Sequence, residues 1–145
     1  MENVENLKVS TKIKLDFKDS KYATGRRKTS IAKIWLKKGS GKIYINGKDY
    51  KEYFKRANHK MQLLRPFEIL DQSAGFDARC NVKGGGLSGQ VGALVHGISK
   101  ALVMFDANSK STLKKEKLTT RDSRAVERKK YGHRKARRSF QFSKR

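Results

Sequence analysis

The sequence of 145 residues contains one cysteine, one proline, one tryptophan and only 13 acidic side chains. A single cysteine, Cys80, excludes a disulfide framework and any zinc site built from cysteines. The sequence has no run of about 18 apolar residues, so it offers no membrane-spanning helix. The hydrophobic fraction is 36%, which is low against roughly 45–50% for an ordinary globular domain. We therefore expect a small core, with much of the chain outside it.

The scarcity of acids leaves a large positive charge, because 36 Lys and Arg residues bring the net charge to +23. This charge is uneven: residues 1–20 are net neutral, residues 21–60 carry +11, residues 61–110 carry +1 and residues 111–145 carry +11. Solubility alone needs a net charge of only about 2–8. Two strongly basic segments therefore predict a polyanionic partner, and nucleic acid is the strongest candidate.

Hydrophobic periodicity predicts a compact core of strands and helices over residues 21–108, between a flexible extension at 1–20 and a basic tail at 109–145. Residues 29–37 and 42–48 alternate apolar and polar side chains with the period of a strand. A Gly-Ser turn separates the two runs, so we expect them to form a β-hairpin. In the first run Ala32, Ile34 and Leu36 should face one side, and the other side should hold Ile31, Lys33, Trp35 and Lys37.

Four helices and one more strand are expected after the hairpin. Asp49–Arg56 is typical of a short helix with Asp49 as its N-cap. A second helix is expected from about Pro66, since proline suits a first turn, and a strand from Phe76 to Val82. The longest apolar stripe then predicts an amphipathic helix at the centre of the core, with the apolar residues Val91, Leu94, Val95, Ile98, Ala101, Leu102 and Phe105. Gly92 and Gly97 on this helix should let another backbone approach, and a short helix is expected near Ser109–Lys115.

Gly84, Gly86 and Gly89 form a G-x-G-x-x-G pattern between the predicted strand and the long helix. A dinucleotide site also needs a second parallel strand that ends in an acid about 20 residues on. The nearest acid, Asp106, instead lies at the end of the helix. Two other interpretations remain: a tight turn that lets the helix pack on its strand, or a phosphate site at the helix amides with Lys83 beside it.

Two basic segments are candidates for contacts with nucleic acid. The first, GRRKTS at residues 25–30, presents Arg26, Arg27 and Lys28 ahead of the predicted hairpin; a solvated charged loop is the alternative. The second is the tail, where Arg121, Arg124 and Arg128 have the spacing of one helix face. Aromatic residues interleave with the tail cations and can stack on bases or riboses, namely Tyr131, Phe140 and Phe142. The other cations there are Lys129, Lys130, Arg134, Lys135, Arg137 and Arg138.

The tail has no apolar face, so it should become ordered only when phosphates neutralise its charge. His59, His96 and His133 share no metal-ligand spacing, and His96 is expected to be a structural or RNA-facing side chain. Cys80 should be a small buried hydrophobe. The sequence indicates no catalytic constellation, no cofactor, no metal and no small-molecule substrate.

The segments TGRRK, GGGLSGQ, LTTRD, ERKKYG and the terminal SKR occur in this order. With them, from about Tyr22 to Arg145, the chain resembles the ninth protein of the small ribosomal subunit in its bacterial or organellar form. The resemblance implies an α+β fold with a four-stranded sheet and helices packed on one face, like the second domain of the fifth small-subunit protein, and a long basic tail. Residues 1–20 lie outside the family pattern, and Ser139-Phe140 stands where the family often has Ala-Pro.

The resemblance also implies a function: a structural, non-enzymatic constituent of the small ribosomal subunit, in the bacterial cytoplasm or the mitochondrial matrix. It would bind ribosomal RNA (rRNA) and neighbouring ribosomal proteins in the subunit head, and its tail would reach the peptidyl-site tRNA, which Lys144 and Arg145 would contact. The expected rRNA-binding residues are Arg26, Arg27, Lys28, Lys83, Gly84, Gly85, Gly86, Arg121, Arg124, Arg128, Lys129, Lys130, Tyr131, His133, Arg134, Lys135, Arg137 and Arg138.

Two other functions compete with this hypothesis. A histone-type protein that compacts nucleic acid would have the same excess of cations, but it would bind duplexes with no preferred rRNA site. A nucleotide-dependent enzyme would use the glycine-rich segment, and it would bind a dinucleotide tightly as the free protein.

Overall fold

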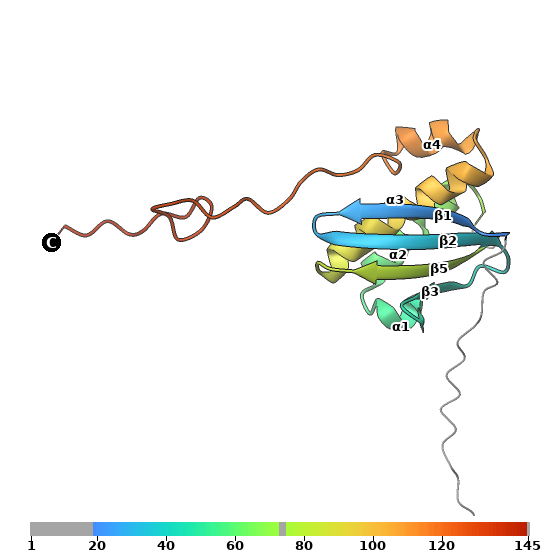
Figure 1. Cartoon of the computed structure of the whole chain (residues 1–145), viewed down its shortest axis with the longest axis horizontal. Helices are drawn as coiled ribbons and strands as arrows, with labels where there is room; N and C mark the ends of the chain where they lie inside the picture. The colour runs from blue at the N-terminus through green and yellow to red at the C-terminus, as the bar shows by residue number, and fades with distance from the viewer. Residues whose placement is uncertain (1–18, 73–74, 145) are drawn as a thin grey trace, which may run out of the picture.

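The computed structural model of the chain describes residues 19–72 and 75–144. Figure 1 shows one sheet with α2 and α3 behind it, and an arm that leaves the core after α4. Most of the predicted extension at 1–20 lies outside the described residues. The elements are β1 (Lys21–Arg27), β2 (Ser30–Lys38), β3 (Ile43–Ile45), β4 (Lys48–Asp49), α1 (Tyr50–Tyr53), α2 (Ala57–Ile69), β5 (Phe76–Lys83), α3 (Leu87–Phe105) and α4 (Ser109–Lys115).

The sheet has five strands in the order β1-β2-β5-β3-β4. β1 pairs antiparallel with β2, β2 antiparallel with β5, β3 parallel with β5, and β3 antiparallel with β4. The α+β class is confirmed, but the expected number of four strands is too small. Here β1 forms a strand where the sequence predicted only a basic loop, and β4 adds a two-residue edge strand.

The predicted hairpin between residues 29–37 and 42–48 is wrong, because β5 lies between β2 and β3. The segment after β2 is held to β5 and not to β2: Ser40 and Lys42 donate their backbone N–H groups to Asp77 Oδ1 at 2.9 and 2.8 Å. The true hairpins are the neighbouring pairs β1–β2 and β3–β4. The second turns at Asn46-Gly47, whose φ angles of 51° and 83° fit the two-residue turn that this dipeptide favours.

One face of the sheet is buried and the other is open to solvent. The burial of β2 and β5 alternates along each strand, with Ile34 and Cys80 as paired residues on the buried side. The prediction for the two sides of β2 is confirmed, since Ala32, Ile34 and Leu36 are fully buried. The open side carries no covering element among the described residues, and we call it the open face.

Helix α3 covers the buried face, and its predicted stripe is confirmed: Val91, Leu94, Ile98 and Leu102 are buried at its centre. Gly97 lets β1 approach, because a Cβ atom there would lie 2.9 Å from the backbone nitrogen of Gly25. A Cβ on Gly25 would in turn collide with the carbonyl oxygen of Ala93. Two glycines facing each other thus set the distance between α3 and β1.

The second helix begins earlier than predicted. α2 starts at Ala57, so Pro66 lies inside it and not in its first turn. Proline has no N–H to donate to the carbonyl four residues back, yet Leu63, Pro66 and Phe67 are buried, and this packing keeps the helix continuous. The short helix with Asp49 as N-cap is confirmed, since the Asp49 side chain accepts from the Lys51 N–H, but it ends at Tyr53 and not at the predicted Arg56.

Two elements follow α3. The predicted short helix at Ser109–Lys115 is confirmed, and Leu113 is fully buried, so α4 packs on the core although it lies in the segment expected to be tail. From Thr119 to Lys144 the chain contains no helix and no side chain is buried; we call residues 119–144 the tail. The expected helical face of Arg121, Arg124 and Arg128 is therefore not formed.

Candidate nucleic-acid interface

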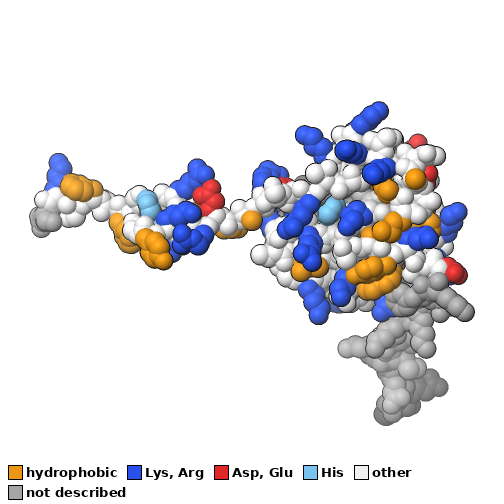
Figure 2. Space-filling model, turned by 45° about the horizontal axis from the view of Figure 1, so that its top comes forward, with side chains coloured by type: hydrophobic (Ala, Val, Ile, Leu, Met, Phe, Trp, Pro, Cys, Tyr) orange, Lys and Arg blue, Asp and Glu red, His pale blue; other side chains and the backbone are white. Residues whose placement is uncertain are grey.

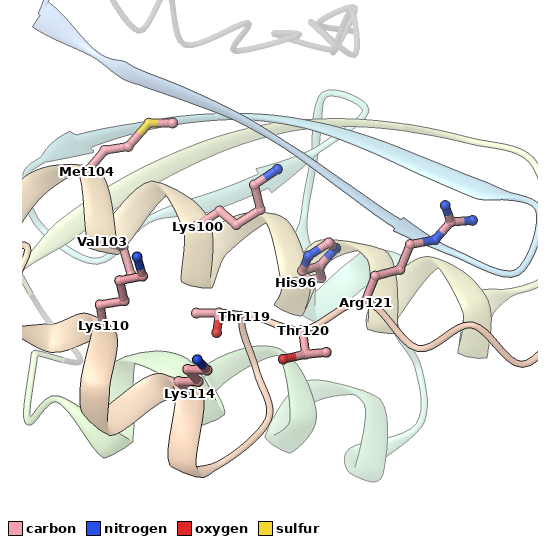
Figure 3. A pocket seen from close by; sticks show the side chains of 9 residues that line it. All are labelled: His96, Lys100, Val103, Met104, Lys110, Lys114, Thr119, Thr120 and Arg121. Atoms are coloured by element: carbon pink, nitrogen blue, oxygen red, sulfur yellow. The ribbon is translucent and has the colours of Figure 1, made fainter.

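The root of the tail lies beside two adjoining hollows in the core surface. The first has a volume of about 590 Å³ and lies between α3, α4 and the start of the tail (Figure 3). Apolar Val103 and Met104 form part of its wall. Its polar lining residues are His96, Lys100, Lys110, Lys114, Thr119, Thr120 and Arg121.

The second hollow, about 350 Å³, shares His96 and Thr120 with the first and reaches the end of β1. Asp122 is the single acid that lines it, against the cations Arg26, Arg27, Arg65, Lys117 and Arg124. The two hollows therefore bring together nine cations, eight of them from β1, α2, α3, α4 and the tail, and Lys117 from the turn after α4. Such a concentration of charge attracts phosphate groups.

Arg27 and Asp122 anchor the tail to the core. The guanidinium of Arg27 pairs with Asp122 Oδ2 at 3.2 Å, and Arg124 binds the same carboxylate at 2.9 Å. The Arg27 side chain crosses Gly92, where a Cβ would collide with it. Gly92 therefore makes room for an arginine side chain and not for the backbone approach that we predicted. The hydrogen bonds from Arg124, together with the nearby charge of Arg27, hold the pKa of Asp122 well below its usual range.

His96 occupies the boundary between the two hollows. Its Nδ1 accepts a hydrogen bond from the backbone N–H of Arg26 at 3.3 Å. Burial lowers the pKa of His96, and the positive charge of Lys100 lowers it further. Lys100 points towards β1 (Figure 3) and donates to the Thr24 carbonyl at 3.1 Å. A neutral His96 thus joins β1 to α3 beside the tail.

The glycine-rich segment forms a tight connection from β5 to α3. Gly84 and Gly85 have φ angles of 75° and 65°, and Gly86 is the N-cap of α3. The Gly84 carbonyl accepts from Ser30 Oγ at 3.0 Å, which fixes the segment to the start of β2. These contacts support the tight-turn interpretation and show no dinucleotide arrangement among the described elements, since α4 and not a strand follows α3.

The start of α3 also borders a third hollow, of about 340 Å³. The cations that line it are Lys28 from the β1–β2 turn and Arg56. Lys83, which we expected there, instead lines a hollow on the open face. His59 contributes a buried Nδ1 without a hydrogen-bond partner, and its Nε2 lies 3.3 Å from Ser88 Oγ.

The tail beyond Arg124 keeps its cations in solvent. Glu127 binds Arg137 at 2.7 Å, which closes a small loop, and His133 pairs with Ser139 in an isolated bridge. Gly132, at φ 69°, turns the chain within this loop, between Glu127 and Arg137. Figure 2 shows Lys and Arg side chains over the visible face of the core and along the tail, and few Asp or Glu side chains.

Tail arginines contact the aromatic rings that were expected to stack on bases. Arg128 lies over the Tyr131 ring at 5.7 Å, and Arg134 over the Phe140 ring at 5.3 Å. Tyr131 nevertheless remains 92% exposed. The other predicted tail cations, Lys129, Lys130, Lys135, Arg138 and Lys144, are exposed, and Arg145 lies outside the described residues.

Other kinds of site find no support in the described part of the chain. In residues 19–72 and 75–144, no three His, Cys, Asp or Glu side chains come together as metal ligands. No described helix has the length and apolar character needed to cross a membrane. Cys80 is buried, as predicted, and burial raises the pKa of its thiol to about 12, so it is neither a thiolate nucleophile nor a ready ligand.

A comparison with known protein families identifies the family of the chain that carries this basic surface. Residues 25–145 match the family described as ribosomal protein S9/S16. The chain belongs to this family. It is a ribosomal protein of the small subunit, a part of a ribonucleoprotein, and it acts in translation as an RNA-binding structural component. The resemblance that its motifs carried is confirmed.

In this family member, sequence reasoning missed five of the nine cations at the two hollows. It found Arg26, Arg27, Arg121 and Arg124 because they stand in dense basic runs. It missed the isolated cations that the fold brings to the same hollows, namely Arg65, Lys100, Lys110, Lys114 and Lys117. One signal was available: Lys100 lies on the predicted long helix, and Lys110 and Lys114 lie on the predicted helix at Ser109–Lys115.

Proposed function

We propose that this ribosomal protein binds rRNA of the small-subunit head with the two hollows and the tail, and that the tip of its tail contacts the peptidyl-site tRNA. The observation that carries the proposal is the group of nine cations that the fold gathers where the tail leaves the core. The tail itself has no buried side chain. The folded core supplies fixed cations, and the tail supplies mobile ones that phosphates would order.

The role of the tail tip follows from its charge and its reach. Figure 1 shows the tail running away from the core, with its end far from every other element. Lys144 is exposed there, so its ammonium group is available to a phosphate that the core does not touch. Positive charge at this point would favour retention of the anionic tRNA.

The first experiment measures binding of the full chain to rRNA of the head domain, with footprinting, at several salt concentrations. We expect a defined footprint, and a loss of affinity of about 10³–10⁵ between 50 and 200 mM salt if about 6–10 phosphates are contacted. Exchanging Arg121 and Arg124 for Gln should reduce the salt slope by about 1 for each lost contact. Protection spread evenly over any duplex would instead show a histone-type protein and contradict the proposal.

A matched control removes the same charge elsewhere. Lys48 and Lys51 lie in β4 and α1, at the opposite edge of the sheet from β1. The double exchange Lys48→Gln and Lys51→Gln should leave the footprint and the salt slope unchanged. An equal loss in both double variants would mean that net charge, and not the hollows, governs binding.

The tRNA contact is tested in assembled ribosomes with a chain that ends at Ser143. Deleting Lys144 and Arg145 should weaken peptidyl-site tRNA binding, while the core keeps its unfolding temperature, because Lys144 is exposed and the described tail buries no side chain. Unchanged tRNA affinity would reject this role and leave the rRNA role intact.

A further inference from the structure

We propose that the open face of the sheet is a second RNA-binding surface, one that stacks unpaired bases of single-stranded RNA. This inference rests on the proposed rRNA function and deepens it by adding a stacking surface on the folded sheet, apart from the cations of the hollows and from the tail. It also uses residues that none of the basic motifs contains.

Strand register places aromatic side chains in one row across four strands. Tyr22 of β1 pairs with Trp35 of β2, Trp35 with Arg79 of β5, and Arg79 with Tyr44 of β3. The Tyr22 and Trp35 rings lie 5.3 Å apart, and Tyr22 is 43% exposed. Two adjoining rings and a guanidinium group on a rigid sheet form a platform of the kind on which bases stack.

Two further rows provide cations next to the rings. Lys33 pairs with Asn81, and Ile31 with Lys83, at positions two and four residues along β2 from Trp35. These four side chains line a hollow of about 210 Å³ on the same face. A base stacked on Trp35 would therefore hold its phosphate beside Lys33, while Asn81 offers an amide that can pair with a base edge.

The charge of the face favours RNA over a protein partner. Its cations include Lys33, Lys37, Arg79 and Lys83, and register places the acids Asp77 and Asp49 on the same side. Asp77 Oδ1 already accepts from the backbone N–H groups of Ser40 and Lys42, and Asp49 Oδ1 accepts from that of Lys51. Protein interfaces tend to exclude lysine from their centre, whereas a phosphate backbone needs it. Rings flanked by lysines thus complement a strand with exposed bases.

The tryptophan makes the proposal directly measurable, because Trp35 is the single tryptophan of the chain. We would titrate the full chain with an unstructured RNA of about ten nucleotides and follow its emission, with a duplex of the same length in parallel. Stacking predicts saturable quenching by the single strand and little quenching by the duplex, whose bases are already stacked.

Two variants and their matched controls locate the effect. Tyr22→Leu should weaken the affinity measured by quenching about tenfold, whereas Tyr50→Leu, which removes a ring from α1 at the other edge of the sheet, should leave this affinity unchanged. Lys33→Glu should weaken the affinity for the single strand more than Lys51→Glu, which makes the same charge change on α1. Circular dichroism checks that each variant is folded.

The outcomes separate this proposal from the proposed function. RNA that binds the chain in a mobility-shift assay without quenching Trp35 overturns the open-face site and leaves the rRNA role standing. Emission that responds to a neighbouring ribosomal protein and not to RNA also overturns it, and assigns the face to a protein contact. If neither the oligonucleotide nor rRNA binds, the proposed function itself fails.

Discussion

The core and the tail of this protein hold positive charge in different ways. In the core, cations from β1, α2, α3 and α4 are held around His96 by the packing of α3 on β1. In the tail, no side chain is buried and the described ion pairs beyond Arg124 join residues of the same segment. The core therefore determines where phosphates can bind, while the tail contributes charge whose position an RNA would determine. Four predictions test this difference.

The largest expected effect comes from the contact between two glycines in the core. Gly25→Ala should lower the free energy of unfolding by about 3 kcal/mol, because the new Cβ meets the Ala93 carbonyl and overpacking of this kind usually costs about 1–3 kcal/mol. Thermal unfolding measures this as a fall of roughly 10 °C. Gly86→Ala is the control: nothing lies within 4 Å of its Cβ, so it should cost no more than about 1 kcal/mol as an N-cap change.

The second effect separates affinity from stability. Exchanging six exposed tail cations for Gln should weaken rRNA binding by about a hundredfold or more, while the unfolding temperature stays the same, because none of them packs on the core. The six are Arg128, Lys129, Lys130, Arg134, Lys135 and Arg138. A fall in unfolding temperature equal to that of Gly25→Ala would show that the tail is part of the folded unit.

The third prediction concerns the anchor between the two regions. Asp122→Asn removes the charge that holds Arg27 to the start of the tail. Trypsin should then cut after Arg121 and Arg124 a few-fold faster, since an exposed pair contributes little and its loss acts locally. Asp71→Asn removes the same charge from the end of α2 and should leave these cleavage rates unchanged; equal acceleration in both variants would rule out a specific anchor.

The smallest effect is a pH dependence of core stability. Because the pKa of His96 is lowered in the folded protein, the unfolded state takes up its proton first, and stability falls as the pH drops below about 6.5. His96→Asn should flatten this part of the profile between pH 7 and 5, measured by urea unfolding. His133→Asn, outside the packed core, should not change it.

Local pattern predicted the elements well but not their neighbours. The period of α3, the alternation of β2 and β5, and the Asp49 cap are properties of short segments, and all were confirmed. The predicted β2–β3 hairpin is wrong because both strands pair with β5 instead of with each other, and β5 lies far along the chain. Asn46-Gly47 marks the true hairpin, since this dipeptide suits a two-residue turn, but the sequence analysis included both residues in the alternating run at 42–48.

The candidate site shows the same division. Dense runs such as GRRK and ERKK stand out in sequence, whereas Lys100 and Arg65 stand alone and become neighbours of Arg121 and Arg124 only through tertiary packing. Pro66 led to a helix start that is too late in the chain. Proline favours a first helical turn, but the burial of Leu63 and Phe67 outweighs that preference, and α2 begins at Ala57. The side of β2 that was predicted to hold Trp35 and Lys33 is the open face.

The place of β5 in the sheet has a consequence for synthesis. Its neighbours β2 and β3 both leave the ribosome before it, and a chain emerges at about 5–20 residues per second. Until Lys83 is outside, β3 has only β4 to pair with, and the apolar sides of both hairpins have no helix α3 to cover them. The nascent chain must therefore wait with its hydrophobic surface uncovered, and arrival of the central strand and α3 closes the whole domain in one late, cooperative step.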